Sequence, residues 1–376
     1  MNRRMMIAAT AVLGLWPAVP ASAAVTSQDW GDWDGREVRL YTLTNAAGME
    51  AKITNYGGVI TSIRVPGRDG AFARVVEGFD DLASYAGPGH GGRYGAVIGR
   101  FANRIKDQTY VLGGTTYHVT RDGKPYDERV WDARAIDGKE PQLVLHLTDP
   151  DGTMGFPGTM EVTVTYTLTA QNVLRIHFHA TTDRPTVASL TNHSYFNMAG
   201  ADAPGATILD QLLTMNADRY TIADEKNVPT GAIREVAGTP FDFRKPTPIG
   251  MHINDPDPML RRAGGYDHNF VINGAPGTLR LAARLEDPVS GRVLEEWTTQ
   301  AGVQVYTANY PPSAPAKAKG YQVHGAVALE AQAFPNAPNV ASFPSALVTP
   351  QRPLDEITEF RFLVARQPVN STAGGR

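Results

Sequence analysis

Segments in which apolar and polar residues alternate recur along most of the chain. The clearest are residues 161–168 (EVTVTYTL) and 174–180 (LRIHFHA), and the residues between them are typical of a turn. Successive side chains of a β-strand point to opposite faces, so this pattern predicts two antiparallel strands joined by a short turn. Further segments of the same kind are residues 37–43, 51–56, 59–65, 143–148, 278–286 and 303–306.

Helical periodicity contributes little to this pattern. No apolar stripe with the helical period continues for twelve residues or more after residue 23. The strand-like segments are separated at short intervals by glycine and proline, of which the chain has 37 and 27. Neither an internal repeat nor a linker of low complexity divides the chain. We therefore predict an all-β fold, a large antiparallel β-sandwich in one domain over residues 24–376.

The N-terminal segment has a different character. Two arginines are followed by a mostly apolar run over residues 5–19 and then by the small residues Ala-Ser-Ala. This is the pattern of a secretory signal peptide, and the apolar run is too short to span a bilayer. We therefore expect a signal peptide over residues 1–23 and cleavage between Ala23 and Ala24. The mature protein is expected to be periplasmic or secreted, without a membrane span.

Composition excludes several classes of function. The net charge is −3 and the pI is near 6.3, so no basic surface for nucleic acid is expected. The chain has no cysteine, which excludes disulfides, thiolate zinc sites and a cysteine nucleophile. His177 and His179 would share one strand face, a spacing that metal sites use, but no third ligand is nearby in the sequence. The sequence therefore predicts no metal site.

Four short strings place polar residues in otherwise apolar, strand-like surroundings. They are GRFANRI with Asn103 and Arg104, TNHSYFN with His193, YDHNF with Asp267, and LEAQAFPNAPN with Glu330. Burying an ionisable group is costly unless the group is paired or used. We therefore expect these strings, which are far apart in the sequence, to converge on one site in the fold.

Each of these residues also has a purely structural interpretation. His193 lies in a polar and aromatic cluster that suits a sugar ring, yet a single histidine is often structural. Glu330 either faces solvent at a strand edge or is buried with a raised pKa. Asp267 could be a turn residue. The pair 103–104 could lie on the surface, or be presented at the end of a strand over residues 95–100.

Taken together, the four strings resemble the aldose 1-epimerase (galactose mutarotase) family. They occur in the family's order, and the resemblance extends from about residue 38 to residue 364. It implies a galactose mutarotase-like supersandwich, which is a large β-sandwich of many antiparallel strands. It also implies an isomerase that interconverts the α- and β-anomers of a free aldose of the galactose or glucose class.

The resemblance implies the reacting residues as well. The hemiacetal ring opens and then recloses on either face of C1, which requires one base and one acid. Glu330 would be the base that takes the proton from the C1 hydroxyl, and His193 would be the acid that protonates the ring oxygen. The roles of the two residues reverse when the ring closes.

The same resemblance implies a set of residues that bind the sugar. Arg104, Asp267 and Gln304 would hold sugar hydroxyls through hydrogen bonds, which are strong where one partner is charged. Asn103 belongs to the same site, mainly as a residue that braces its loop. No cofactor and no metal are implied. The partner is a small aldose, and the protein is expected to be a monomer or a homodimer.

One family motif is missing from the sequence. The family usually carries a second histidine in an LHGG segment after GRxANRI, whereas residues 120–131 of this chain read TRDGKPYDERVW. His90 or His118 is a candidate to replace that histidine. The shortened segment also favours two alternatives, a carbohydrate-binding protein with little or no catalysis and an enzyme for an oligosaccharide or a modified aldose. Glycoside hydrolysis is disfavoured, because it usually requires two carboxylates at one bond.

Overall fold

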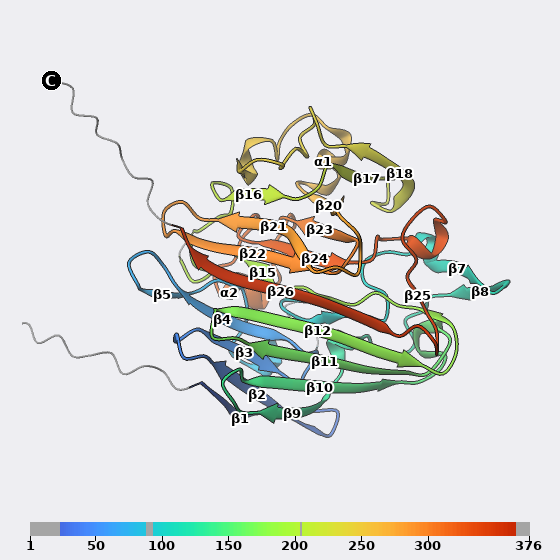
Figure 1. Cartoon of the computed structure of the whole chain (residues 1–376), viewed down its shortest axis with the longest axis horizontal. Coiled ribbons are helices and arrows are strands. Elements are labelled where there is room, and N and C mark those ends of the chain that lie inside the picture. Colours follow the sequence, from blue (N-terminus) through green and yellow to red (C-terminus); the bar gives the residue numbers. More distant parts are fainter. Residues whose placement is uncertain (1–22, 88–92, 204, 366–376) are drawn as a thin grey trace, which may run out of the picture.

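Three antiparallel sheets contain most of the strands of the protein (Figure 1). The computed structural model describes residues 23–87, 93–203 and 205–365. The predicted signal peptide, apart from Ala23, lies outside these ranges, and so does His90. No helix within the described ranges is long and apolar enough to cross a membrane.

The largest sheet has nine strands and forms one layer of the sandwich. In their hydrogen-bonded order the strands are β19 (Thr247–Pro248), β16 (Leu212–Met215), β21 (Arg280–Glu286), β22 (Arg292–Thr298), β26 (Leu354–Val364), β12 (Val173–Thr182), β11 (Met160–Leu168), β10 (Gln142–Asp149) and β9 (Asp132–Ile136). In Figure 1 this sheet crosses the view from β16 near the top to β9 at the bottom.

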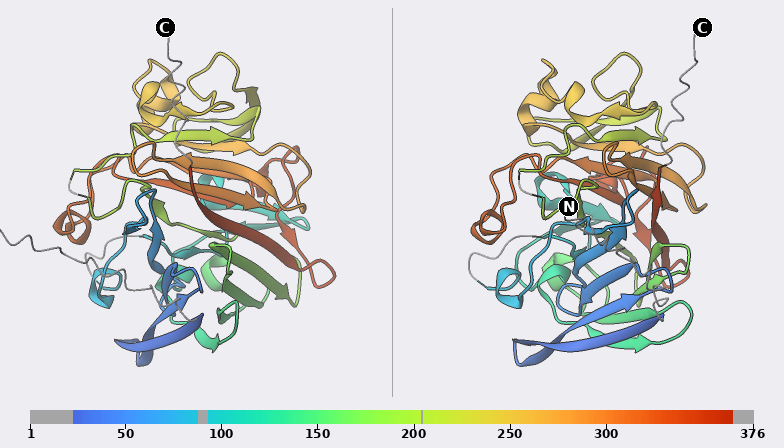
Figure 2. Two further views of the ribbon diagram at one scale, coloured as in Figure 1. Left: turned by 60° about the vertical axis from the view of Figure 1, so that its left-hand side comes forward. Right: turned by 90° about the vertical axis from the view of Figure 1, so that its left-hand side faces the viewer.

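Two further sheets cover the nine-stranded sheet. The six-stranded sheet has the order β15 (Tyr195–Phe196), β24 (Val327–Gln332), β23 (Gly302–Tyr306), β20 (Asp267–Val271), β17 (Arg219–Ala223) and β18 (Pro229–Glu235). The five-stranded sheet has the order β1 (Ala24–Trp33), β2 (Arg36–Thr44), β3 (Glu50–Thr54), β4 (Ile60–Pro66) and β5 (Phe72–Arg74). The turned views of Figure 2 place β1 and β2, in blue, at one end of the molecule.

The remaining elements are short. Three two-stranded pairs are β6 (Val97–Ile98) with β14 (Thr191–Asn192), β7 (Thr109–Leu112) with β8 (Thr115–His118), and β13 (Thr186–Val187) with β25 (Leu347–Val348). The α-helices are α1 (Pro258–Ala263) and α2 (Ala314–Ala318). The 3₁₀ turns are Leu82–Ser84, Lys106–Gln108, Tyr126–Glu128, Thr153–Gly155, Ile249–Met251 and Ala337–Asn339.

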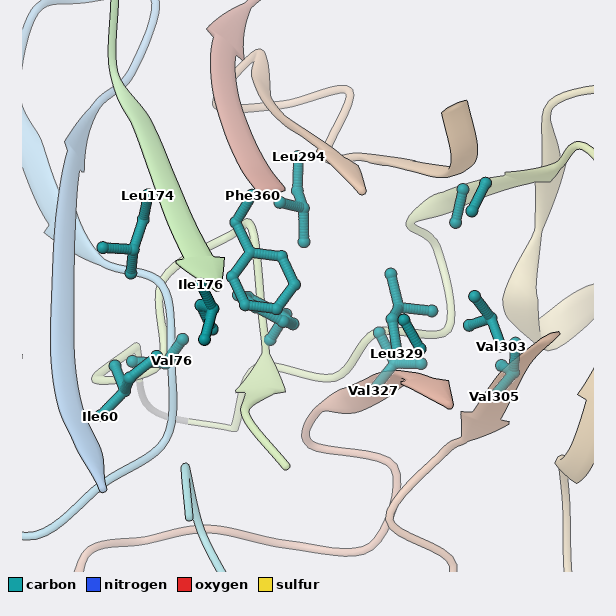
Figure 3. Packing of buried hydrophobic residues seen from close by; sticks show 14 of the residues in the cluster. Ile60, Val76, Leu174, Ile176, Leu294, Val303, Val305, Val327, Leu329 and Phe360 are labelled. Atoms are coloured by element: carbon teal, nitrogen blue, oxygen red, sulfur yellow. The ribbon is translucent and has the colours of Figure 1, made fainter. Parts of the chain in front are cut away.

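One hydrophobic cluster joins the three large sheets. It includes Ile60 of β4, Ile176 of β12, Phe360 of β26 and Leu329 of β24, and all of these side chains are almost fully buried (Figure 3). Because burial of apolar surface is the main stabilising contribution to a fold of this size, this shared core holds the sheets together as layers of one sandwich.

The sequence prediction of an all-β, antiparallel sandwich is confirmed. The expected hairpin is β11 and β12, paired in register from Leu168 opposite Leu174. The other predicted segments correspond to β2, β3, β4, β10, β21 and β23. Within the segment 95–100 only β6 is strand, and Gly95 has a φ of 75°, which lies outside the range of a strand. The side chain of Arg100 is buried in an ion pair with Asp149.

Alternation along β24 separates the core from a polar face. Val327, Leu329 and Ala331 belong to the hydrophobic cluster, and the residues that alternate with them, among them Glu330, point to the opposite face of the sheet. Glu330 is therefore on the face that does not touch the core, although only 5% of its surface is exposed. This arrangement positions the polar residues described next.

Candidate active site

The structure brings the four polar strings together at one cavity. The cavity has a volume of about 280 Å³ and lies over the polar face of β24, β23 and β20. Its walls are formed by residues from all four strings and from the segments beside them. They are Arg93, Ile98, Asn103, Arg104, His193, Asp267, Tyr306, Tyr310 and Glu330.

Strand register explains why these side chains are neighbours. Glu330 of β24 lies directly opposite Gln304 of β23, and Asp267 of β20 lies opposite Tyr306 of β23. Side chains with the same parity on adjacent strands share one face, so all four project from the same side of the sheet. Residues that alternate with core residues along each strand thus lie side by side in one row across β24, β23 and β20.

His193 and Glu330 face each other in the cavity. The Nε2 atom of His193 lies 3.7 Å from Oε1 of Glu330, and both side chains are largely buried. The backbone of His193 is held by two hydrogen bonds, because its N–H donates to the carbonyl of Ala96 and its carbonyl accepts from the N–H of Gly95. Its ring stacks on Tyr195 with centroids 4.9 Å apart. Stacking on Tyr195 therefore supports the imidazole with Nε2 on the side of Glu330.

Burial keeps Glu330 protonated at neutral pH. Desolvation raises the pKa of Glu330 to about 8, and the negative charge of Asp267 adds to the rise. Arg104 and Arg93 oppose the shift in this pKa but do not cancel it. Of the two interpretations of Glu330, the structure therefore shows the buried carboxyl with a raised pKa.

Burial also keeps the imidazole of His193 neutral at neutral pH. Desolvation lowers the pKa of His193 to about 4, and the Arg93 cation lowers it as well. The carboxylates of Asp127 and Asp267 act in the opposite direction on the same pKa. The pair of His193 and Glu330 consequently holds one proton between about pH 4 and pH 8, and that proton is on the carboxyl group.

Asp267 is held by two of the predicted binding residues. Gln304 donates from Nε2 to one carboxylate oxygen of Asp267 at 2.6 Å, and Arg104 donates to the other at 3.1 Å. Arg104 also donates to Oδ1 of its neighbour Asn103 at 3.1 Å. Gln304 itself is buried beneath this network and does not line the cavity. Asp267 begins β20 and is not a turn residue.

Several residues that contribute to the site were missed in the sequence, among them Tyr306, Tyr310, Arg93 and Asp127. Tyr306 could have been found, because it alternates with Gln304 on the same face of β23. Arg93 and Asp127 pair with each other, with Nε of Arg93 3.3 Å from Oδ2 of Asp127. Both lie outside strands with alternating patterns, so no periodic signal marks them. Asp127 comes from the segment that stands where the LHGG motif is missing.

His118 does not replace the missing histidine. It ends β8 with its side chain exposed, its Nδ1 lies 3.2 Å from Oγ1 of Thr109, and it is not part of the cavity wall. His90 lies outside the described residues. The groups that the structure places beside His193 are instead Arg93 and Asp127.

This arrangement suits the movement of protons on a small polyhydroxy molecule. One donor and one acceptor face the same cavity, and a fixed carboxylate beside a guanidinium can hold hydroxyl groups. Tyr306 and Tyr310 add aromatic surface to the wall, which suits the apolar face of a sugar ring.

Comparison with known proteins gives a consistent result. The family model described as aldose 1-epimerase matches residues 39–361. A galactose mutarotase of Bos taurus is 38% identical over 330 residues, covering 84% of this chain and 92% of the relative. The chain belongs to the aldose 1-epimerase family. An aldose 1-epimerase of Escherichia coli is 31% identical over 348 residues, covering 88% of this chain and 96% of that protein.

Solved structures agree with this membership of the aldose 1-epimerase family. The crystal structure of a galactose 1-epimerase from Lactobacillus acidophilus matches with a TM-score of 0.80 at 25% identity, covering 92% of this chain and all of that one. As an aldose 1-epimerase the chain is an isomerase, and its reaction is the interconversion of aldose anomers. A binding protein without catalysis is not favoured, because the matched relatives are named as epimerases or mutarotases.

Proposed function

We propose that Glu330 and His193 carry out the epimerisation of a free aldose of the galactose or glucose class in this cavity. The observation that supports this most directly is the 3.7 Å approach of Nε2 and Oε1 in a cavity lined mainly by polar groups. A base and an acid at this separation can reach the C1 hydroxyl and the ring oxygen of one pyranose, which are bonded to the same carbon.

Ring opening requires two proton transfers, one away from the C1 hydroxyl and one to the ring oxygen. Glu330 takes the proton of the C1 hydroxyl while His193 gives a proton to the ring oxygen, and the C1–O5 bond breaks to leave an open-chain aldehyde. Rotation about the C1–C2 bond presents the other face of the aldehyde. The bond then reforms as the proton transfers run in reverse, so atoms and charges balance.

The bound sugar prepares the pair for this step. The pKa values of the protein alone place the shared proton on Glu330, whereas the reaction starts from the carboxylate and the imidazolium. A C1 hydroxyl that donates to Glu330 favours the carboxylate, and a ring oxygen that accepts from His193 favours the imidazolium. Substrate contacts thus shift the proton from Glu330 to His193 without a change in the net charge of the site.

Asp267, Arg104 and Asn103 bind the remaining hydroxyls in this proposal. Asp267 offers its carboxylate to the cavity while Gln304 and Arg104 fix its orientation. Hydrogen bonds to charged groups are about twice as strong as neutral ones, so these residues would contribute strongly to the binding of the sugar. We further propose, from the leader-like pattern of residues 1–23, that the enzyme works in the periplasm or after secretion.

The deciding experiment is polarimetry on freshly dissolved α-D-glucose and α-D-galactose. We expect the wild-type protein to accelerate mutarotation, and we expect Glu330→Gln and His193→Asn each to lower the catalysed rate by about a hundredfold or more. Circular dichroism and thermal unfolding establish that both variants are folded. His118→Ala is the matched control and should keep the full rate. A folded Glu330→Gln variant with wild-type activity would reject the assignment.

A further inference from the structure

A cavity of about 620 Å³ lies over the outer face of the five-stranded sheet, apart from the proposed active site. Its wall shares no residue with the wall of the active-site cavity. Residues of β1 to β5 form its floor, and residues from the segment 199–203 together with Lys319, which follows α2, form the rest of its wall. The epimerase chemistry proposed above uses none of these residues.

Strand alternation places cationic side chains on this outer face. Ala51 and Ile63 belong to the hydrophobic core, whereas Lys52 and Arg64 alternate with them and face away from it. Arg74 of β5 lies directly opposite Arg64 of β4. Like charges opposite each other on adjacent strands destabilise a sheet. The arrangement therefore has a cost that anions close to both arginines would remove.

Protein groups already hold and compensate one of these arginines. Arg74 is only 9% exposed, and its guanidinium donates to Asp202 and, at 3.2 Å, to the hydroxyl of Tyr321. The carboxylate of Asp80 lies 3.5 Å from the same guanidinium. Arg74 is consequently a fixed cation with carboxylates of its own.

Arg64, by contrast, has no anionic partner. Its side chain is exposed in the wall of the cavity and forms no hydrogen bond or ion pair within the ranges that the structure describes. Glu50 lies opposite Arg64 on β3, but it pairs with Lys52 instead, at a long 3.7 Å. The five N–H donors of Arg64 are therefore available to a ligand.

The other cations lie close to the same part of the wall. Lys319 donates to Asp80 across the cavity wall. Burial acts to raise the pKa of Asp80, but the hydrogen bond from Lys319 and the positive charges of Arg74 and Lys52 outweigh it and lower that pKa. Three cationic side chains thus act together at this one carboxylate.

The charge of the wall favours a doubly charged anion. Four cations and two carboxylates line the cavity, which leaves two positive charges in excess; they are Lys52, Arg64, Arg74 and Lys319 against Asp80 and Asp202. A phosphate monoester carries about −1.5 to −2 at neutral pH, which matches this excess. The phosphate diester of a lipid head group carries a single charge. Guanidinium groups also suit the geometry of phosphate oxygens.

We infer that this cavity binds inorganic phosphate or a small soluble molecule that carries a phosphate monoester. Arg64 and Lys52 would contact the phosphate oxygens, with Arg74 as the fixed cation beside them. Ser62 lies opposite Lys52 in register, and its hydroxyl, which has no hydrogen bond within the described residues, would donate as well. The half-exposed ring of Phe72 offers apolar surface to the rest of the molecule. This inference goes beyond the proposed function and does not depend on it.

The test is isothermal titration calorimetry at low ionic strength with inorganic phosphate and glycerol 3-phosphate, and with glycerol as the neutral control. We expect both phosphates to bind with a Kd of about 1 mM or lower and glycerol not to bind. Arg64→Gln should weaken binding of both by about tenfold, as the loss of one hydrogen bond between charged groups would give. Arg134→Gln, exposed on β9 and outside the cavity, is the matched control and should bind like the wild type.

Thermal unfolding distinguishes a ligand site from a cluster that only supports the fold. Without phosphate, Arg64→Gln should have the same Tm as the wild type or a higher one, because it loses no ion pair and no longer opposes Arg74. Added phosphate should raise the Tm of the wild type more than that of the variant. A lowered Tm of Arg64→Gln without phosphate, with an equal response to phosphate, would assign Arg64 to the fold and overturn the inference.

Three further outcomes would also overturn it. Phosphate binding that Arg64→Gln does not weaken would place the anion elsewhere. Cosedimentation with phosphatidylglycerol vesicles, without binding of either free phosphate, would point to a lipid surface. Competitive inhibition of glucose mutarotation by glycerol 3-phosphate, corrected for the reaction without enzyme, would place the anion in the active-site cavity; we expect no inhibition, because the two walls share no residue.

Discussion

At the scale of single residues, burial gives the site its chemistry. Glu330 and His193 are ordinary acid–base groups in water, and desolvation moves their pKa values apart, to about 8 and about 4. The pair therefore holds one proton over a wide range of pH. Ring opening takes one proton from the pair and returns one proton to it. Arg93, close to both residues, lowers the pKa of each.

The first prediction at this scale concerns the pH dependence of catalysis. We expect kcat/KM to be bell-shaped, with an acid limb near pH 4 where the pair gains a second proton and a basic limb near pH 8 where it loses its only one. Initial-rate polarimetry, corrected for the buffer reaction at each pH, measures the two limbs. A rate that continues to rise above pH 9 would contradict the one-proton requirement.

A variant of Arg93 gives an independent check on the same pair. Since the Arg93 cation lowers the pKa of both His193 and Glu330, Arg93→Gln should move both limbs to higher pH. Arg134→Gln, exposed on β9, is the control and should leave both limbs in place. Unmoved limbs in folded Arg93→Gln would show that Arg93 does not act on the pair.

Residue-scale features differ in how far the sequence predicts them. The sequence predicts one shared site for five residues, because each stands out as a polar group in an apolar string. The structure places all five in the wall of one cavity, and they are Asn103, Arg104, His193, Asp267 and Glu330. The sequence could not show that Gln304 acts beneath Asp267, since this depends on which side chains meet across β20 and β23.

At the scale of elements, close backbone contacts support the site. Gly95 has a φ of 75°, and a Cβ atom there would lie 2.1 Å from the carbonyl oxygen of Ile60. Its N–H donates to the carbonyl of His193, and its carbonyl accepts from Asn192. Only glycine combines this conformation with this contact, so the residue connects the core strand β4 to the backbone of the candidate acid.

Substitution of this glycine should damage both stability and activity. Gly95→Ala must displace Ile60 or His193, and we expect it to lower the free energy of unfolding by about 2 kcal/mol or more. Gly113→Ala has a similar φ of 58° but nothing within 4 Å, so it should cost only about 1 kcal/mol. Urea denaturation measures both values, and equal losses would contradict the importance of the Ile60 contact.

Regular strands were predictable and irregular segments were not. Alternation marks β10, β11 and β12 because each has one face in the core and one face nearer to solvent. The two-residue strands β6, β14 and β15 are too short for a period to appear, although they carry or flank Ile98 and His193. Their positions are fixed by tertiary contacts, which local patterns do not contain.

At the scale of the whole molecule, buried carboxyl groups link stability to pH. Burial raises the pKa of Glu77, Glu296, Glu330 and Glu356 to about 8. A carboxyl whose pKa is raised on folding stabilises the protein below its unfolded pKa and loses that contribution as the pH rises to its folded pKa. Burial also lowers the pKa of His193 and His268 to about 4, and these histidines affect stability only below about pH 6.5.

The free energy of unfolding should therefore fall as the pH rises from 6.5 to 8. In this window the histidines are mostly neutral in both states, whereas the four carboxyls are protonated mainly in the folded state. Glu296→Gln removes one of these groups and should reduce the slope by about 1.4 kcal/mol per pH unit. Urea unfolding between pH 6.5 and pH 8 measures it, with the exposed Glu140→Gln as the control. An unchanged slope in Glu296→Gln would exclude this residue as a source.

The row of side chains across β24, β23 and β20 has a consequence for refolding. Glu330, Gln304 and Asp267 share one face only in the native strand register, and a slip of a single residue would turn one of them into the core. A chain with correct secondary structure but a shifted pairing would thus have normal circular dichroism and no activity. Recovered mutarotation after dilution from denaturant is accordingly a direct assay of strand alignment, which spectroscopic probes of β-content do not detect.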